Sequence, residues 1–161
     1  MAGAHDGLKH RLEVLGVELC GALDGTIRAA LAAQSLPGDG ALRPVQLIGT
    51  LGLDKSLASR VVRSISTEDP LRALHGMPTP QGIGLIARAA SSRGAPREAL
   101  ERLDRAKAAY ADLLSEFGGG RTDLEATLMG WIPEQRSRAE RDARRSVFRG
   151  MTTMSGTRTS A

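Results

Sequence analysis

Basic and hydroxyl side chains recur along one side of a helix predicted for residues 55 to 65. Helical spacing places five of them on the same face, namely Lys55, Ser56, Ser59, Arg60 and Arg63. The opposite face is apolar and consists of Leu57, Ala58, Val61, Val62 and Ile65. Arginine can form two hydrogen bonds to guanine, and serine can donate to or accept from base edges and phosphates. The pattern therefore predicts a helix that packs on a small core and presents its outer face to the major groove of DNA.

The polar residues differ in the contact that each side chain type favours. We expect groove contacts from Ser56, Ser59 and Arg60. We expect phosphate contacts from Lys55 and Arg63, and from Arg43 at the start of the preceding helix. These six residues are the predicted DNA-binding set.

A preceding helix and a tight turn must hold this helix in place. Pro44 suits a first helical position because its missing N–H is not needed there. The first helix is expected to pack through four apolar residues: Val45, Leu47, Ile48 and Leu51. Gly52 tolerates the positive φ of a turn, Leu53 fills the space beneath it, and Asp54 can cap the second helix.

This segment resembles the helix-turn-helix of bacterial transcription regulators. The resemblance rests on Gly52, Leu53 and the Ser59–Arg60 pair within ASRVVRSI, whereas Ile48 and Ala58 depart from the usual residue types. Residues 43 to 150, with EDPLRALHGMP and RRSVFRG, resemble the N-terminal part of larger regulators of this kind. The resemblance implies a further domain after Gly150, and so a truncated chain without an effector domain. Two short amphipathic helices around a glycine also occur in proteins that do not bind DNA.

The remaining segments are predicted to be helical as well. Leucine and isoleucine recur at spacings of three and four from residue 8 to residue 31, a stripe that either covers the chain's own core or forms a dimer. Gly16, Gly21 and Gly25 weaken that helix and allow a kink. Thr79 is expected to cap a helix from Pro80 to about residue 92, and a second apolar stripe runs from 100 to 117.

Two further local signals complete the predicted arrangement. Thr122 and Glu125 form a capping-box pattern. No alternating strand pattern follows residue 65, so no β-hairpin wing is expected.

The expected fold is all-α, with six or seven helices around a helix-turn-helix core. The predicted parts are an N-terminal amphipathic helix (1–35), a helix-turn-helix domain (36–93), a C-terminal helical extension (94–150) and a disordered tail (151–161). The extension includes an arginine-rich segment, 136 to 149, which is either a solvated helix face with internal ion pairs or a second phosphate-contacting or RNA-binding surface.

The composition limits the kinds of partner that the chain can bind. The 161 residues carry 22 basic and 18 acidic side chains, a net charge of +4 that permits a polyanionic partner without requiring one. Aromatic residues make up only 2%, which disfavours stacking on single strands. One cysteine excludes an internal disulfide, and no secretion signal or membrane span is recognisable, so a cytoplasmic location is expected.

No catalytic, metal or cofactor site is predicted. His5, His10 and His75 lack ligand spacing with each other or with Cys20. The segment GIGLIA, 82 to 87, lacks the preceding strand that a dinucleotide-binding motif needs.

The resulting hypothesis is sequence-specific binding of duplex DNA by a transcriptional regulator that is not an enzyme. A homodimer would supply two half-sites about one helical turn apart. The alternatives are a helical protein–protein adaptor, in which the 100–117 stripe binds a partner helix, and an RNA-binding protein.

Overall fold

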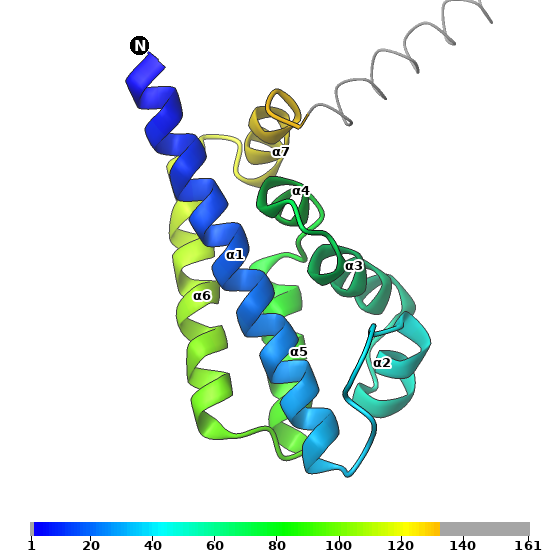
Figure 1. Ribbon diagram of the computed structural model, residues 1–161. Helices are drawn as coiled ribbons and strands as arrows, with labels where there is room; N and C mark the ends of the chain where they lie inside the picture. The colour runs from blue at the N-terminus through cyan, green and yellow to red at the C-terminus, as the bar shows by residue number, and fades with distance from the viewer. Residues whose placement is uncertain (1, 133–161) are drawn as a thin grey trace, which may run out of the picture.

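The computed structural model describes residues 2 to 132, and all of its regular elements are helices (Figure 1). The seven helices of this part of the chain are α1 (Ala2–Ala33), α2 (Pro44–Leu51), α3 (Lys55–Ser66), α4 (Pro70–His75), α5 (Pro80–Ser92), α6 (Arg97–Glu116) and α7 (Arg121–Met129). The expected all-α class is confirmed. The described residues between α3 and α5 form no strand, as expected for a chain without a wing. The arginine-rich segment and the tail lie outside the described residues.

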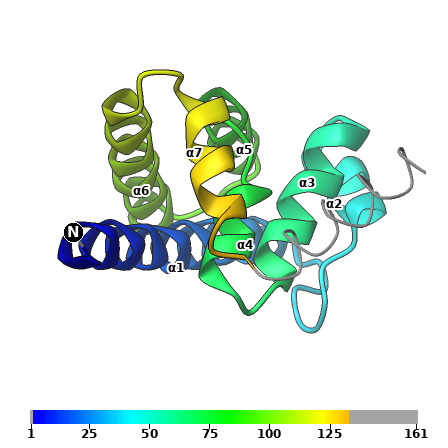
Figure 2. The same cartoon turned by 90° about the horizontal axis from the view of Figure 1, so that it is seen from above.

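The long helix α1 organises the molecule because four other helices pack against it. Helix α6 lies along one side of α1, while α3 and α4 lie along another side and α5 packs between these two groups (Figures 1 and 2). Helix α2 packs on α3 and α5, and α7 packs on α4. The expected segments 1–35, 36–93 and 94–150 therefore all contribute to one hydrophobic core.

The leucine stripe of α1 belongs to this core. Its buried members are Leu12, Leu15, Leu19, Leu23, Ile27 and Leu31. Burying each such side chain contributes roughly 1.5–3 kcal/mol. The alternative in which the stripe covers its own core is confirmed, and the stripe is not available to form a dimer. The 100–117 stripe is used in the same way, with Leu103, Tyr110 and Leu113 buried, so it is not free to bind a partner helix.

The glycines of α1 do not kink or split it, since the helix runs without interruption from Ala2 to Ala33. Gly16 instead permits a close approach between helices. A Cβ at this position would lie 2.4 Å from the carbonyl oxygen of Pro70, at the start of α4. The glycine is therefore needed for packing.

Two sequence-based expectations about helix packing and capping are wrong. Val45 is 71% exposed and Ile48 is 38% exposed, because the eight-residue α2 buries only the narrow stripe formed by Leu47 and Leu51. The capping box at Thr122 does not form, because α7 begins two residues earlier than that cap would place it, and Gly120 is its N-cap. Glu125 pairs with Arg121 instead, with 2.8 Å between Oε1 and Nε.

Candidate nucleic-acid interface

The connection between α2 and α3 is a tight turn fixed by local hydrogen bonds. Gly52 has a φ of 66°, a left-handed conformation that favours glycine, and its N–H donates to the carbonyl of Ile48 at 3.1 Å. Leu53 is buried beneath the turn. The carboxylate of Asp54 accepts a hydrogen bond from the N–H of Leu57 at 2.9 Å, so Asp54 caps α3 as expected.

A second contact secures this turn from a distant part of the chain. The Nε of Arg93, the residue after α5, donates to the carbonyl oxygen of Thr50 at 2.6 Å. This bond satisfies a carbonyl in the last turn of α2, which has no partner within its own helix. Sequence reasoning missed Arg93, because no local pattern links residues that are 43 positions apart.

The predicted division of α3 into two faces is confirmed. Ala58 and Val61 are buried, and Leu57, Val62 and Ile65 are half-buried. On the other side, Lys55, Ser56, Arg60 and Arg63 are exposed, and Ser59 is half-buried. The spacing on α3 therefore holds the apolar side chains inward and leaves the polar ones accessible from solvent.

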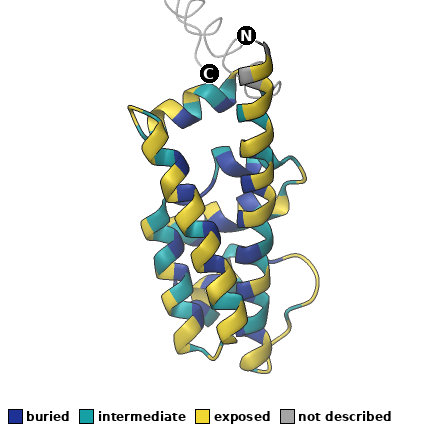
Figure 3. Cartoon of the chain, turned by 90° about the vertical axis from the view of Figure 1, so that its left-hand side faces the viewer, coloured by how far each residue is buried: buried dark blue, intermediate teal, exposed yellow. Residues whose placement is uncertain are grey.

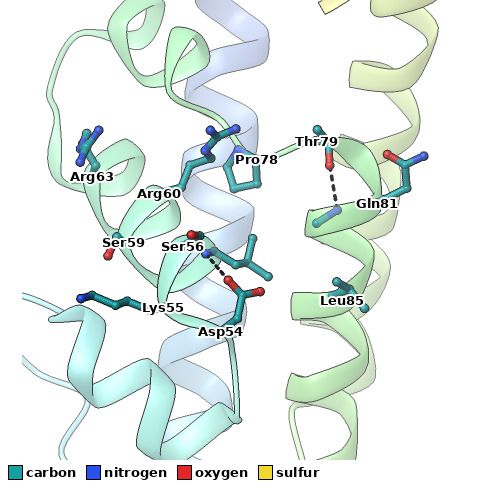
Figure 4. A pocket seen from close by; sticks show the side chains of 12 residues that line it. Asp54, Lys55, Ser56, Ser59, Arg60, Arg63, Pro78, Thr79, Gln81 and Leu85 are labelled. Atoms are coloured by element: carbon teal, nitrogen blue, oxygen red, sulfur yellow. Dashed lines mark hydrogen bonds between the residues drawn. The ribbon is translucent and has the colours of Figure 1, made fainter.

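The polar side of α3 forms one wall of a groove of about 600 Å³, whose other wall is the start of α5 (Figure 4). We call it the α3–α5 groove. Its lining includes five of the six predicted DNA-binding residues, Lys55, Ser56, Ser59, Arg60 and Arg63. In Figure 4, Arg60 extends toward Pro78, whereas Lys55 and Arg63 lie on the side of α3 farther from α5.

Arg43, the sixth predicted residue, does not line this groove. It is exposed and precedes the first residue of α2, where its backbone N–H donates to Oε1 of Gln46 at 3.4 Å. The structure thus brings together the predicted residues of α3 and leaves Arg43 apart from them.

The start of α5 adds a polar side chain that was not among the predicted DNA-binding residues. Thr79 caps α5 as expected, with its Oγ1 accepting from the N–H of Gly82 at 3.1 Å. Gln81 is exposed and lines the groove opposite α3. An amide side chain can bind base edges or phosphates. Its position in the first turn after a Thr-Pro cap was visible in the sequence, but its proximity to α3 was not.

The α3–α5 groove is electropositive. Its lining holds three cations, from Lys55, Arg60 and Arg63, and one carboxylate, from Asp54. None of the three cations forms an ion pair or a side-chain hydrogen bond with another residue in the described part of the chain. Unpaired cations on an exposed helix face keep their full charge available for a polyanion.

The described residues give less support to a metal site, a reactive cysteine or a membrane span. Among residues 2 to 132, no cluster of three or more histidine, cysteine or carboxylate side chains could hold a metal ion. Burial raises the pKa of the Cys20 thiol to about 11, and nearby Asp24 adds to this shift, so the thiol is a poor nucleophile at neutral pH. None of the described helices is long and apolar enough to cross a membrane.

Comparison of the chain with protein-family models, with curated proteins and with solved structures found no match. The candidate site therefore rests on its own geometry and charge.

Proposed function

We propose that this protein binds duplex DNA through α3 and acts as a transcriptional regulator. The observation that carries the proposal is the exposed face of α3, where two serines and three cations without a partner among residues 2 to 132 lie on a helix whose other side packs in the core. An α-helix fits the major groove of B-DNA, and a helix held rigidly loses little freedom on binding. The same proposal places the protein in the cytoplasm, with the chromosome.

Within this proposal the residues have distinct roles. Arg60 makes the base contact, because it lies between Lys55 and Arg63 along α3 and its side chain extends toward Pro78, with Ser56 and Ser59 on the same face. Lys55 and Arg63 bind phosphates on the two sides of that contact. Arg43, at the start of α2, binds a phosphate farther along the backbone.

The test is the salt dependence of binding to a short fluorescent duplex, measured by anisotropy. Binding through phosphates should weaken steeply with salt, with a log–log slope of about 0.9 per contact. Arg63→Ala should lower this slope by about one and weaken all sequences alike. Arg60→Ala should cost roughly 1–3 kcal/mol and relax the preference at one base pair.

Arg97→Ala is the matched control. Arg97 is also an arginine at a helix surface, with 91% of its side chain exposed, but it pairs with Glu101 at 2.8 Å and does not line the groove. The control should bind as the unmodified protein does. Binding that is absent at low salt, or an equal loss from Arg97→Ala and Arg63→Ala, would refute the proposal.

A further inference from the structure

A second groove lies between α1 and α6, and it shares no lining residue with the α3–α5 groove. Figure 3 looks onto the side of the molecule where α1 and α6 lie next to each other, whereas in Figure 4, which looks into the α3–α5 groove, α1 lies behind α3 and α5. The second groove has a volume of about 670 Å³ and an apolar floor that includes Val14, Ala106 and Ala109. We call this surface the α1–α6 face, and Figure 3 shows the exposed residues of both helices.

The α1–α6 face exposes apolar side chains that the core does not use. Val14, which lines the groove, is 49% exposed, and Val17, one turn further along α1 and outside the groove lining, is 60% exposed. The neighbouring residues on α6, Ala106 and Ala109, have small side chains that allow another helix to approach closely. Exposed valines beside a groove with a small-residue floor are suited to burial by a helix.

The charges along the rim are balanced and ordered. Helix α1 carries Arg11 and then Glu18, and α6 carries Arg102 and Arg105 and then Asp112 and Glu116. The helices run in opposite directions, since Arg11 pairs with Glu116 at 2.9 Å near one end, while Arg102 lies over Gly21 farther along. The cationic end of one helix therefore lies beside the acidic end of the other.

Most of these rim charges are unused within one copy. Arg11 and Glu116 pair with each other, but Glu18, Asp112, Arg102 and Arg105 form no ion pair with any residue between 2 and 132. Two cations and two carboxylates are thus free on a surface that holds equal numbers of both signs. Such a surface complements a copy of itself better than it complements a partner of one charge sign.

We propose that the α1–α6 face binds a second copy of this chain. A two-fold axis running along the helices would lay α1 of each copy on α6 of the other, at the same level and in opposite directions. Arg11 would then lie near Asp112 of the partner copy, and Glu18 near Arg105 of the partner copy. Val14 and Val17 would be buried between the two copies.

This arrangement has a consequence that rests on the proposed function. Because a two-fold axis that runs along the helices reverses every direction perpendicular to it, the α3–α5 grooves of the two copies would face in opposite directions. Each copy would then bind its own duplex, and the dimer would bridge two DNA segments. It would not read two half-sites one helical turn apart on a single duplex.

Sedimentation velocity of the full chain without DNA tests the dimer. The unmodified protein should show a concentration-dependent dimer, and Val14→Glu should raise its dissociation constant about 100-fold by placing a charge in the interface. Val45→Glu is the matched control: Val45 is 71% exposed on α2, away from this face, and its substitution should leave the dimer intact. Circular dichroism checks that each variant is folded.

A charge exchange tests the pairing itself. Glu18→Arg and Arg105→Glu should each weaken the dimer about 10-fold, and the double variant should recover most of that loss. An unmodified protein that is monomeric at every concentration would overturn the proposal, as would equal effects of Val14→Glu and Val45→Glu. A monomer that still binds duplex DNA with steep salt dependence would refute the dimer alone and leave the proposed function standing.

Discussion

Three cationic side chains line each of the two grooves, but only the α1–α6 face also holds as many carboxylates. The α3–α5 groove has Lys55, Arg60 and Arg63 against the single carboxylate of Asp54, which is occupied in capping α3. The α1–α6 face has three arginines against Glu18, Asp112 and Glu116, and its lining includes the exposed Val14. The two surfaces thus hold the same number of cations but suit different partners. The α3–α5 groove suits a polyanion, and the α1–α6 face suits a surface like itself.

This difference matters because net charge alone cannot locate a binding site. The whole chain has a net charge of only +4, too little to identify a nucleic-acid-binding protein. The arrangement of unpaired charge is more informative, since a cation beside a carboxylate contributes little to the field that a ligand meets.

The largest expected effect comes from removing all three cations of one groove at a time. The triple variant Lys55→Ala, Arg60→Ala, Arg63→Ala should weaken binding to a single short duplex about 100-fold or more, since it removes several phosphate and base contacts. The matched variant Arg11→Ala, Arg102→Ala, Arg105→Ala loses the same formal charge from the α1–α6 face. It should change duplex affinity by less than about 3-fold, because charges beyond a Debye length are screened. Equal losses in both variants would mean that net charge, and not α3, determines binding.

A smaller effect is expected from Cys20, which lies where α1 supports α3. Its Sγ is 3.5 Å from the carbonyl oxygen of Ser64 on α3, and burial raises its pKa to about 11. Alkylation by iodoacetamide at pH 8 should therefore be about 10- to 100-fold slower in the folded protein than in urea. Fast alkylation without denaturant would show that α3 separates from α1, and would remove the rigid support on which the α3 surface depends.

The same thiol gives the folding free energy a dependence on pH. The folded state holds the thiol proton more tightly than the unfolded state, because the folded pKa is the higher one. The stabilising contribution is complete below the ordinary pKa near 9, and it is lost as the pH rises toward 11. Urea unfolding across this interval should show stability falling, and Cys20→Ala should reduce that fall.

The features that the sequence predicts correctly are those with short-range causes. The two faces of α3 follow from helical spacing, and the caps at Asp54 and Thr79 depend on residues only three positions away. The positive φ at Gly52 is likewise a local property of a tight turn. These features account for most of the α3 side of the candidate site.

The features that the sequence misses depend on contacts between distant residues. Periodicity identified the leucine stripe of α1 but not the helices that cover it, so the pattern favoured burial in the core and left dimerisation open. The exposure of Val45 depends on how much of α2 the neighbouring helices reach, and the bond from Arg93 to Thr50 joins two helices far apart in the chain. Gln81 belongs to the groove only because α5 packs beside α3 in space.

The smallest expected effect distinguishes the inner side of α1 from its outer side. A Cβ at Gly16 would meet the backbone of Pro70 at 2.4 Å, whereas a Cβ at Gly7 would have no neighbour within 4 Å. Alanine favours a helix over glycine by up to about 1 kcal/mol, so Gly7→Ala should stabilise the protein slightly. Gly16→Ala should destabilise it by roughly 1–3 kcal/mol despite the same gain, because α4 must move away from α1.

Urea unfolding at a fixed low protein concentration measures both variants, and the sign of the difference is the decisive result. Opposite signs of the change in unfolding free energy would show that α4 packs closely on one side of α1, whereas the N-terminal turns of α1 are exposed to solvent. A stabilised Gly16→Ala variant would mean that α4 is not held against α1. In that case α3, which connects to α4 through only three residues, Thr67 to Asp69, would lose the support of one of the three helices that pack against it, α1, α2 and α4. The α3 surface would then not be held rigidly relative to the α1–α6 face.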